Sequence, residues 1–276
     1  MSDIRRPAVA GMFYPGDARE LRTMVQSFLG PLAMGAEAPK AIIAPHAGYI
    51  YSGPVAATAY RALAKARAEI RRIVLLGPSH RLAFDGLALS SARYFATPLG
   101  NIPVDRAACD AIRDLPQVHV LDEAHAMEHS LEVHLPFLQL ILDEFSVVPL
   151  VVGDAAPAVI SEVLERLWDG PQTRFVVSSD LSHYHDYQTA KYLDEATSRA
   201  IEKLRFEDIG YDHACGRNPI SGLLNLARAH GLQGRTLDQR NSGDTAGPRD
   251  QVVGYGAYAF SEAASEDKGT RAERGS

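Results

Sequence analysis

Three apolar, β-branched runs, each followed at once by polar side chains, constrain the fold of this chain most strongly. They are the segments KAIIAPHAGY at 40–49, RRIVLLGPSH at 71–80 and RFVVSSDLSHYH at 174–185. Runs of this kind are typical of buried parallel strands, and ligands bind at the carboxyl ends of such strands. We therefore expect His46, His80 and the pair Asp180 and His183 to meet at one edge of a sheet, as a metal centre or an acid–base site.

Strand and helix patterns alternate along the chain, which predicts one α/β domain over residues 1–260 with a mixed, mostly parallel sheet flanked by helices. Asp17 and Gly30 mark the ends of the first predicted helix, and Asn218 is expected to cap another over 218–231. A helix over 128–145 must be kinked or split at Pro136. The charged tail 261–276 is expected to be disordered.

Composition narrows the class of function. The chain has 276 residues, a net charge of −6 and two cysteines. The acidic balance argues against a nucleic-acid-binding face, and two cysteines provide no disulfide framework. The N-terminus has no signal-peptide pattern, and no apolar stretch is long enough to span a membrane. We therefore expect a cytoplasmic protein that binds neither nucleic acid nor a membrane.

Two local patterns suggest how the site is tuned. Asp180 precedes His183 by three residues, which predicts a carboxylate that orients the imidazole and raises its pKa. The alternative is that Asp180 or Ser179 only caps a helix. Cys215 lies just before a predicted helix and close to Arg217, which predicts a thiol shifted toward thiolate and toward metal ligation. The alternative for Cys215 is a small buried apolar residue.

The segment HAMEHSLEVH at 125–134 is rich in ligand-type side chains. Its spacing matches neither H-E-x-x-H nor H-x-x-E-H, so a zinc-protease helix is excluded. Of its side chains, His129 is the best candidate to reach the edge of the sheet.

The blocks AIIAPHAGY, LLGPSH, EHSLE, VVSSDLSH and CGR, in this order, resemble the Memo family, named for a mediator of cell motility. The resemblance covers nearly the whole chain, from about residue 7 to residue 260. It implies a fold similar to class III extradiol ring-cleaving dioxygenases, which hold non-haem Fe(II). It also implies His46, His80 and Cys215 as metal ligands, with His129, Asp180 and His183 around the open positions.

A thiolate replaces the carboxylate of the ring-cleaving enzymes in this ligand set, and sulfur favours copper and zinc more than a carboxylate does. The resemblance therefore implies Fe(II) or copper as the cofactor, with zinc possible. One hypothesis is a non-haem metal-dependent oxidoreductase in which His129, Asp180 and His183 act as catalytic residues on an unknown small-molecule substrate. A second hypothesis is a peptide- or partner-binding adaptor without turnover, with a radical-SAM protein as one possible partner. Zinc-dependent hydrolysis ranks behind both.

Overall fold

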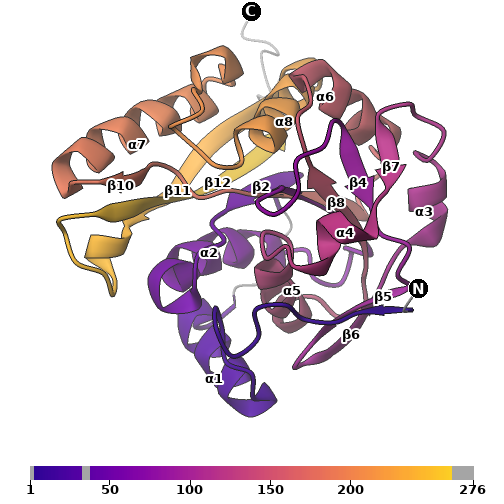
Figure 1. Ribbon diagram of the computed structural model, residues 1–276, viewed down its shortest axis with the longest axis horizontal. Helices are drawn as coiled ribbons and strands as arrows, with labels where there is room; N and C mark the ends of the chain where they lie inside the picture. The colour runs from indigo at the N-terminus through magenta and orange to yellow at the C-terminus, as the bar shows by residue number, and fades with distance from the viewer. Residues whose placement is uncertain (1–2, 33–37, 263–276) are drawn as a thin grey trace, which may run out of the picture.

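The fold is built around a mixed β-sheet with helices on both faces (Figure 1). The computed structural model describes residues 3–32 and 38–262. Within these residues the sheet has nine strands in the order β10-β12-β2-β9-β3-β8-β4-β7, with β11 paired to β12. The strands are β2 (Ala41–Ala44), β3 (Arg72–Pro78), β4 (Leu87–Leu89), β7 (Val118–Val120), β8 (Ser146–Val152), β9 (Thr173–Ser178), β10 (His183–His185), β11 (Leu232–Asn241) and β12 (Val252–Glu262).

The four central strands β2, β9, β3 and β8 run parallel, and antiparallel pairs lie toward the margins of the sheet. The apolar runs that predicted these strands are fully buried, as for Ile73, Val74 and Leu75 in β3. Strands covered on both faces have no solvent side, so their sequences are continuously apolar rather than alternating. The expected α/β class and mixed sheet are confirmed.

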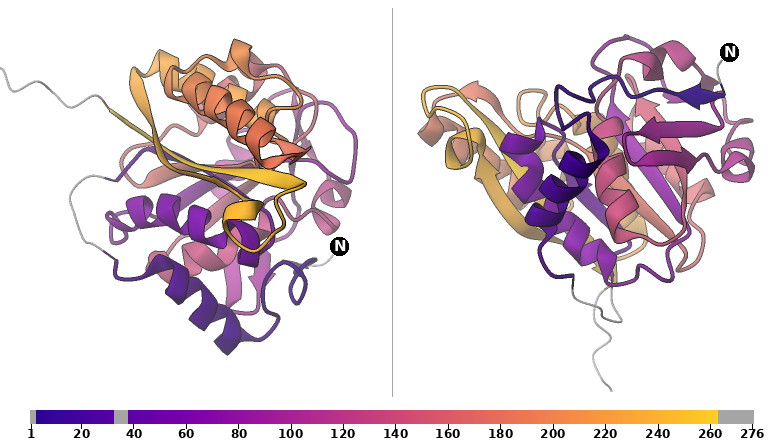
Figure 2. Two further views of the ribbon diagram at one scale, coloured as in Figure 1. Left: turned by 90° about the vertical axis from the view of Figure 1, so that its left-hand side faces the viewer. Right: turned by 90° about the horizontal axis from the view of Figure 1, so that it is seen from below.

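Two helical layers enclose the sheet (Figure 2). Helices α1, α2 and α5 pack on one face, and α6, α7 and α8 pack on the other. Asp17 caps α1 by accepting from the N–H groups of Arg19 and Glu20, and Gly30 ends this helix at φ +57°, as predicted. The helices are α1 (Ala18–Leu29), α2 (Tyr49–Ala64), α3 (Arg106–Asp110), α4 (Asp122–Ala126), α5 (Leu135–Ile141), α6 (Pro157–Arg166), α7 (Tyr187–Glu202) and α8 (Arg217–Ala229), with 3-10 turns η1 (Glu132–His134), η2 (Phe206–Asp208) and η3 (Ser242–Asp244).

One local expectation is confirmed, and several boundaries differ from the expected ones. The segment 128–145 splits at Pro136, one of the two predicted outcomes, and Pro136 takes a first-turn position of α5 after the turn η1. Helix α8 starts one residue before Asn218, and Gly216 is its N-cap. The tail was expected to begin at residue 261, but β12 continues to Glu262 because it pairs with β11 to that point. The remainder of the tail, 263–276, lies outside the described residues.

The N-terminal arm is held against the body of the protein by one buried carboxylate. Strand β1 (Ile4–Arg5) joins β5 (Tyr94–Thr97) and β6 (Gly100–Pro103) in a second sheet of three strands. The fully buried carboxylate of Glu132 accepts from the Arg5 guanidinium, from the N–H groups of Ala8 and Val9, and from the Tyr14 hydroxyl. Because these four donors span the arm, Glu132 determines where the arm lies.

Glu132→Ala is expected to lower the free energy of unfolding by about 3–5 kcal/mol, because it leaves the buried Arg5 guanidinium with carbonyl partners but without its counter-charge. The matched control is Asp143→Ala, which removes an exposed ion pair with Arg67 and should cost less than about 1 kcal/mol. Urea unfolding followed by circular dichroism measures both. Equal losses in the two variants would show that Glu132 does not anchor the arm.

Candidate metal centre

The polar segments that follow β2, β3 and β9 meet at one edge of the sheet, as the sequence predicts. A cavity of about 1050 Å³ opens there. Its lining includes all the predicted site residues: His46, His80, His129, Asp180, His183 and Cys215. Parallel register between β2 and β9 and between β9 and β3 aligns the ends of these strands, which explains why residues far apart in sequence meet here.

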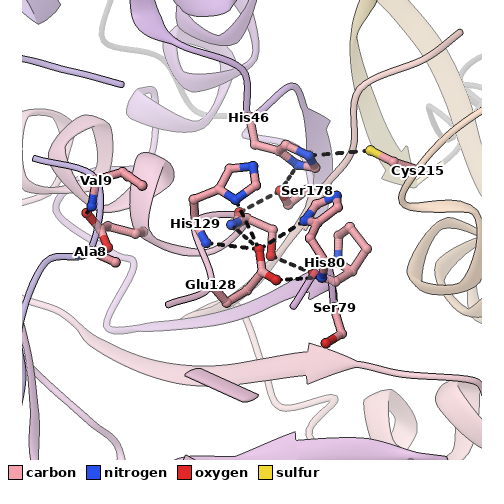
Figure 3. Close-up of polar contacts among 12 residues, drawn as sticks. Ala8, Val9, His46, Ser79, His80, Glu128, His129, Ser178 and Cys215 are labelled. Atoms are coloured by element: carbon pink, nitrogen blue, oxygen red, sulfur yellow. Dashed lines mark hydrogen bonds and ion pairs between the residues drawn. The ribbon is translucent and has the colours of Figure 1, made fainter. Parts of the chain in front are cut away.

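Two imidazoles and one thiol form the core of the site (Figure 3). His46, His80 and Cys215 each offer a ligand atom, and these atoms lie within 4.8 Å of one another. The imidazole ring centroids of His46 and His80 are 5.1 Å apart, and the Cys215 sulfur lies 3.4 Å from His46 Nε2. Zinc, copper and iron are all bound by imidazole nitrogen and thiolate sulfur, so the donor set fits a transition metal.

The outer nitrogen of His46 is fixed by a hydroxyl relay. Ser178 donates its hydroxyl proton to the Ser130 carbonyl oxygen at 2.6 Å, so its oxygen accepts from His46 Nδ1–H, also at 2.6 Å. Nε2 therefore carries the free lone pair and faces the Cys215 sulfur. Burial, reinforced by neighbouring imidazoles, holds the pKa of His46 well below its usual value. The ring is neutral near pH 7, as a metal ligand must be.

The outer nitrogen of His80 is fixed by a buried carboxylate. One Glu128 oxygen accepts from His80 Nδ1–H at 2.9 Å, and the other accepts from the His80 backbone N–H at 2.6 Å. Burial alone would raise the pKa of Glu128, but hydrogen bonds from His80 and from backbone N–H groups outweigh it and lower the pKa to about 2. The charged carboxylate therefore selects the His80 tautomer whose Nε2 is free. A carboxylate behind a histidine ligand is a common arrangement in metal sites.

Glu128 itself is not available as a ligand. It also accepts from the backbone N–H groups of His129 and Ser130, each at 2.9 Å. Three of the four N–H donors reach Oε1 and one reaches Oε2, so hydrogen bonds within the protein engage both oxygens of this buried carboxylate. His80, Glu128 and His129 lie close enough together to suggest a second cation site, but their geometry is that of a hydrogen-bonded support.

Cys215 is held close to β9 by the start of α8. A side chain at Gly216 would place its Cβ 2.5 Å from the Ser178 carbonyl oxygen, so glycine permits this approach. The Asp180 N–H donates to the Cys215 sulfur at 3.3 Å. The predicted lowering of the thiol pKa is wrong for the metal-free protein, because burial of the sulfur and the nearby Asp180 carboxylate raise the pKa to about 12. A bound cation would lower the pKa of the Cys215 thiol instead, since a coordinated thiol loses its proton.

Asp180 and His183 both line the cavity but do not form the predicted pair. The Asp180 carboxylate accepts from the His46 N–H at 2.8 Å and from the Ala47 N–H, so it supports the loop after β2. Burial raises the pKa of Asp180 to about 7 against these hydrogen bonds. Burial, together with the imidazoles of His80 and His185, lowers the pKa of His183, contrary to the expected increase.

His129 completes the imidazole cluster. Its ring stacks on His80 with a centroid distance of 4.8 Å, lies 5.4 Å from His46 and contacts Phe13 at 4.7 Å. Burial lowers the pKa of His129 to about 4, so the ring is neutral near pH 7. Phe13 belongs to the arm that Glu132 anchors, and the arm therefore forms one wall of the cavity.

Sequence reasoning missed Glu128 and Ser178, the two side chains that fix the ligand tautomers. Ser178 ends a strand that was predicted, and Glu128 lies in a segment singled out only for a zinc-protease pattern that it fails. The available signal was a carboxylate next to His129 in a segment rich in ligand-type side chains. Nothing local indicated that this carboxylate faces His80.

The fold and this cluster define an α/β protein with a candidate metal centre of histidine and cysteine. The profile of the Memo-like protein family matches residues 5–259. A MEMO1 family protein of Metallosphaera sedula is 35% identical, with 94% of this chain and 99% of the relative covered. The MEMO1 family protein of Ignicoccus hospitalis is 38% identical, with 93% of this chain and 98% of the relative covered. That of Aquifex aeolicus is 36% identical, with 93% of this chain and 99% of the relative covered.

The chain therefore belongs to the Memo family, as its sequence blocks indicate. Among solved structures, an uncharacterized protein from Escherichia coli K12 aligns with a TM-score of 0.48 at 15% identity, covering 79% of this chain and 99% of that one. In the described ranges, no helix combines the length and the apolar character needed to cross a membrane.

Glu128→Gln is expected to weaken Co²⁺ binding by about 10- to 100-fold, because a neutral amide oxygen accepts from His80 Nδ1–H more weakly and the amide NH₂ faces another N–H donor. Isothermal titration calorimetry with Co²⁺ measures the change. The matched control is Glu123→Gln, an exposed position on the neighbouring helix α4, which should bind as the wild type does. Unchanged Co²⁺ affinity in Glu128→Gln would show that the Glu128 carboxylate does not support metal binding by His80.

The same carboxylate predicts a pH dependence of stability. Its pKa is about 2 when folded against a usual 4.5, so its stabilisation is complete above pH 4.5 and is lost as the pH falls toward 2. Glu128→Gln should therefore lower the unfolding free energy by on the order of 3 kcal/mol at pH 7, and the deficit should shrink below about pH 4.5. Urea unfolding of metal-free protein from pH 7 downward tests this. A deficit independent of pH would contradict it.

Proposed function

We propose that this protein binds a transition metal through His46, His80 and Cys215 and works as a non-haem metal-dependent oxidoreductase. Fe(II) or copper is the proposed metal. The observation that carries the proposal is the convergence of the three ligand atoms within 4.8 Å, with the outer nitrogens of both imidazoles already fixed by Ser178 and Glu128. In metal sites, hydrogen bonds to the outer nitrogens of histidine ligands commonly hold the rings in the orientation that the metal requires.

The cavity beside the ligands supplies the other requirement of an enzyme. Its volume of about 1050 Å³ reaches the upper end of the range for small-molecule sites. Bound iron or copper would supply one-electron and dioxygen chemistry at the base of this cavity.

Protein side chains around the ligands are suited to proton handling. Asp180, with a pKa raised to about 7, can take up or release a proton near neutral pH. Its Oδ2 lies 3.9 Å from His46 Nε2, at the edge of the ligand cluster. The neutral rings of His129 and His183 can each donate a hydrogen bond to a substrate or accept one from it. We assign these three residues the catalytic roles.

The rim of the cavity favours a second candidate, an adaptor that binds a peptide or a partner without turnover. Met12, Tyr184 and Tyr211 are 71%, 71% and 77% exposed and line the same cavity. Exposed aromatic and methionine side chains around a concavity are a common feature of binding surfaces. Under this reading the pocket takes up a side chain of the partner.

Oxygen consumption by anaerobically Fe(II)- or Cu-loaded protein, given a panel of catechols and other enediols, tests the proposal. We expect one metal per chain and substrate-dependent O₂ uptake. His46→Ala and Cys215→Ser should lose the metal and the uptake together, whereas His119→Ala, an exposed histidine on β7, should keep both. Stoichiometric metal without O₂ uptake on any substrate would contradict the oxidoreductase and favour the adaptor.

A further inference from the structure

A second, smaller cavity lies on another side of Cys215. Its volume is about 470 Å³, and it lies between the loop after β3, the end of β8 and the start of α8. Leu82, Phe84, Val152 and Pro219 contribute apolar surface to its lining. None of the predicted site residues except Cys215 lines it, so it is separate from the cavity that holds the imidazoles.

Tyr211 and Cys215 line both cavities and therefore lie at their boundary. The Arg217 guanidinium lies over the Tyr211 ring at 4.3 Å and donates through Nε to the Ile209 carbonyl oxygen at 2.7 Å. Arg217 also donates to Asn218, whose amide nitrogen donates to the Gly153 carbonyl oxygen at 3.0 Å. This chain of contacts fixes the boundary relative to the sheet, so the smaller cavity is a built feature of the fold.

The lining determines what this cavity can admit. The apolar part of the lining favours uncharged groups, because a charged group placed against it would lose hydration. The exposed carboxylates of Asp85 and Asp154 also line the cavity and repel anions. At less than half the volume of the main cavity, it offers less room for a large organic substrate than the main cavity does.

We propose that the smaller cavity is a second entrance, through which a small uncharged reactant such as dioxygen reaches the sulfur side of the metal centre while the main cavity holds the organic substrate. The proposal rests on the proposed function, in which an organic substrate and dioxygen meet at one metal ion. Separate entrances allow a small reactant to arrive after the substrate has filled the main cavity.

Thiol labelling of metal-free protein tests the entrance without relying on oxygen chemistry. Methyl methanethiosulfonate is small and uncharged: the Cys215 sulfur bonds to its methylthio group, methanesulfinate leaves and the thiol proton passes to buffer. N-(1-pyrenyl)maleimide is uncharged and much larger, and its alkene carbon adds to the sulfur while the proton ends on the neighbouring carbon. Peptide mapping by mass spectrometry separates Cys215 from the buried Cys109.

Ala83→Trp places a large ring at an exposed position lining the smaller cavity. We expect it to slow methyl methanethiosulfonate labelling of Cys215 by about threefold, because it closes one of the two cavities that reach this residue, and to change pyrenyl maleimide labelling by less than about 1.5-fold. Leu82→Ala, which widens the same cavity, should accelerate the small reagent only. Ala229→Trp, at the exposed far end of α8, is the matched control and should label as the wild type does.

Near-ultraviolet circular dichroism establishes that each variant is folded before the rates are compared. If Ala83→Trp leaves the small-reagent rate at the control value, or slows both reagents equally, the second entrance is wrong. Either result leaves the proposed function standing, because metal binding and O₂ uptake are measured separately. If metal-loaded wild-type protein takes up no O₂ on any substrate but the labelling rates change as expected, the oxidoreductase function is wrong and the second entrance to Cys215 stands.

Discussion

The buried carboxylate of Glu128 is the interaction on which the site depends most. Four N–H groups surround it, two from His80 and two from the backbone of residues 129 and 130. A buried charge is tolerable only when its hydrogen bonds are satisfied, so this carboxylate binds the loop after β3 to the segment that carries His129. Glu128 thus fixes both the proposed ligand His80 and the neighbouring segment that carries His129.

The segment from Glu128 to His134 extends this support across the whole site. The Ser130 carbonyl oxygen orients Ser178, and through it His46. Glu132 anchors the N-terminal arm, and with it Phe13 beside His129. The segment has little regular structure because its backbone and side chains serve these contacts rather than a helix. Its one short turn, η1, ends where Pro136 allows α5 to begin.

The parts of the structure that depend on local patterns were predictable from the sequence. Continuous apolar runs identified β2, β3 and β9, and their polar ends identified His46, His80 and Asp180, because the ends of parallel strands share an edge. Short elements such as β7 and β10 carry too few residues for a periodic signal.

Properties that depend on tertiary contacts could not be predicted from local sequence patterns. The pKa of Cys215 rises because its sulfur is buried beside Asp180, although a helix start and Arg217 suggested the reverse. Asp180 faces the His46 loop rather than His183, a choice made by the packing of β2 against β9.

The central claim is that two imidazoles and one thiolate, separated widely in sequence, bind one metal ion. X-ray absorption spectroscopy of protein loaded with a single equivalent of metal tests it most directly. The account predicts one sulfur and two imidazole nitrogens around the metal, with the sulfur contribution lost in Cys215→Ser. A spectrum of oxygen and nitrogen ligands alone, unchanged by that substitution, would contradict it.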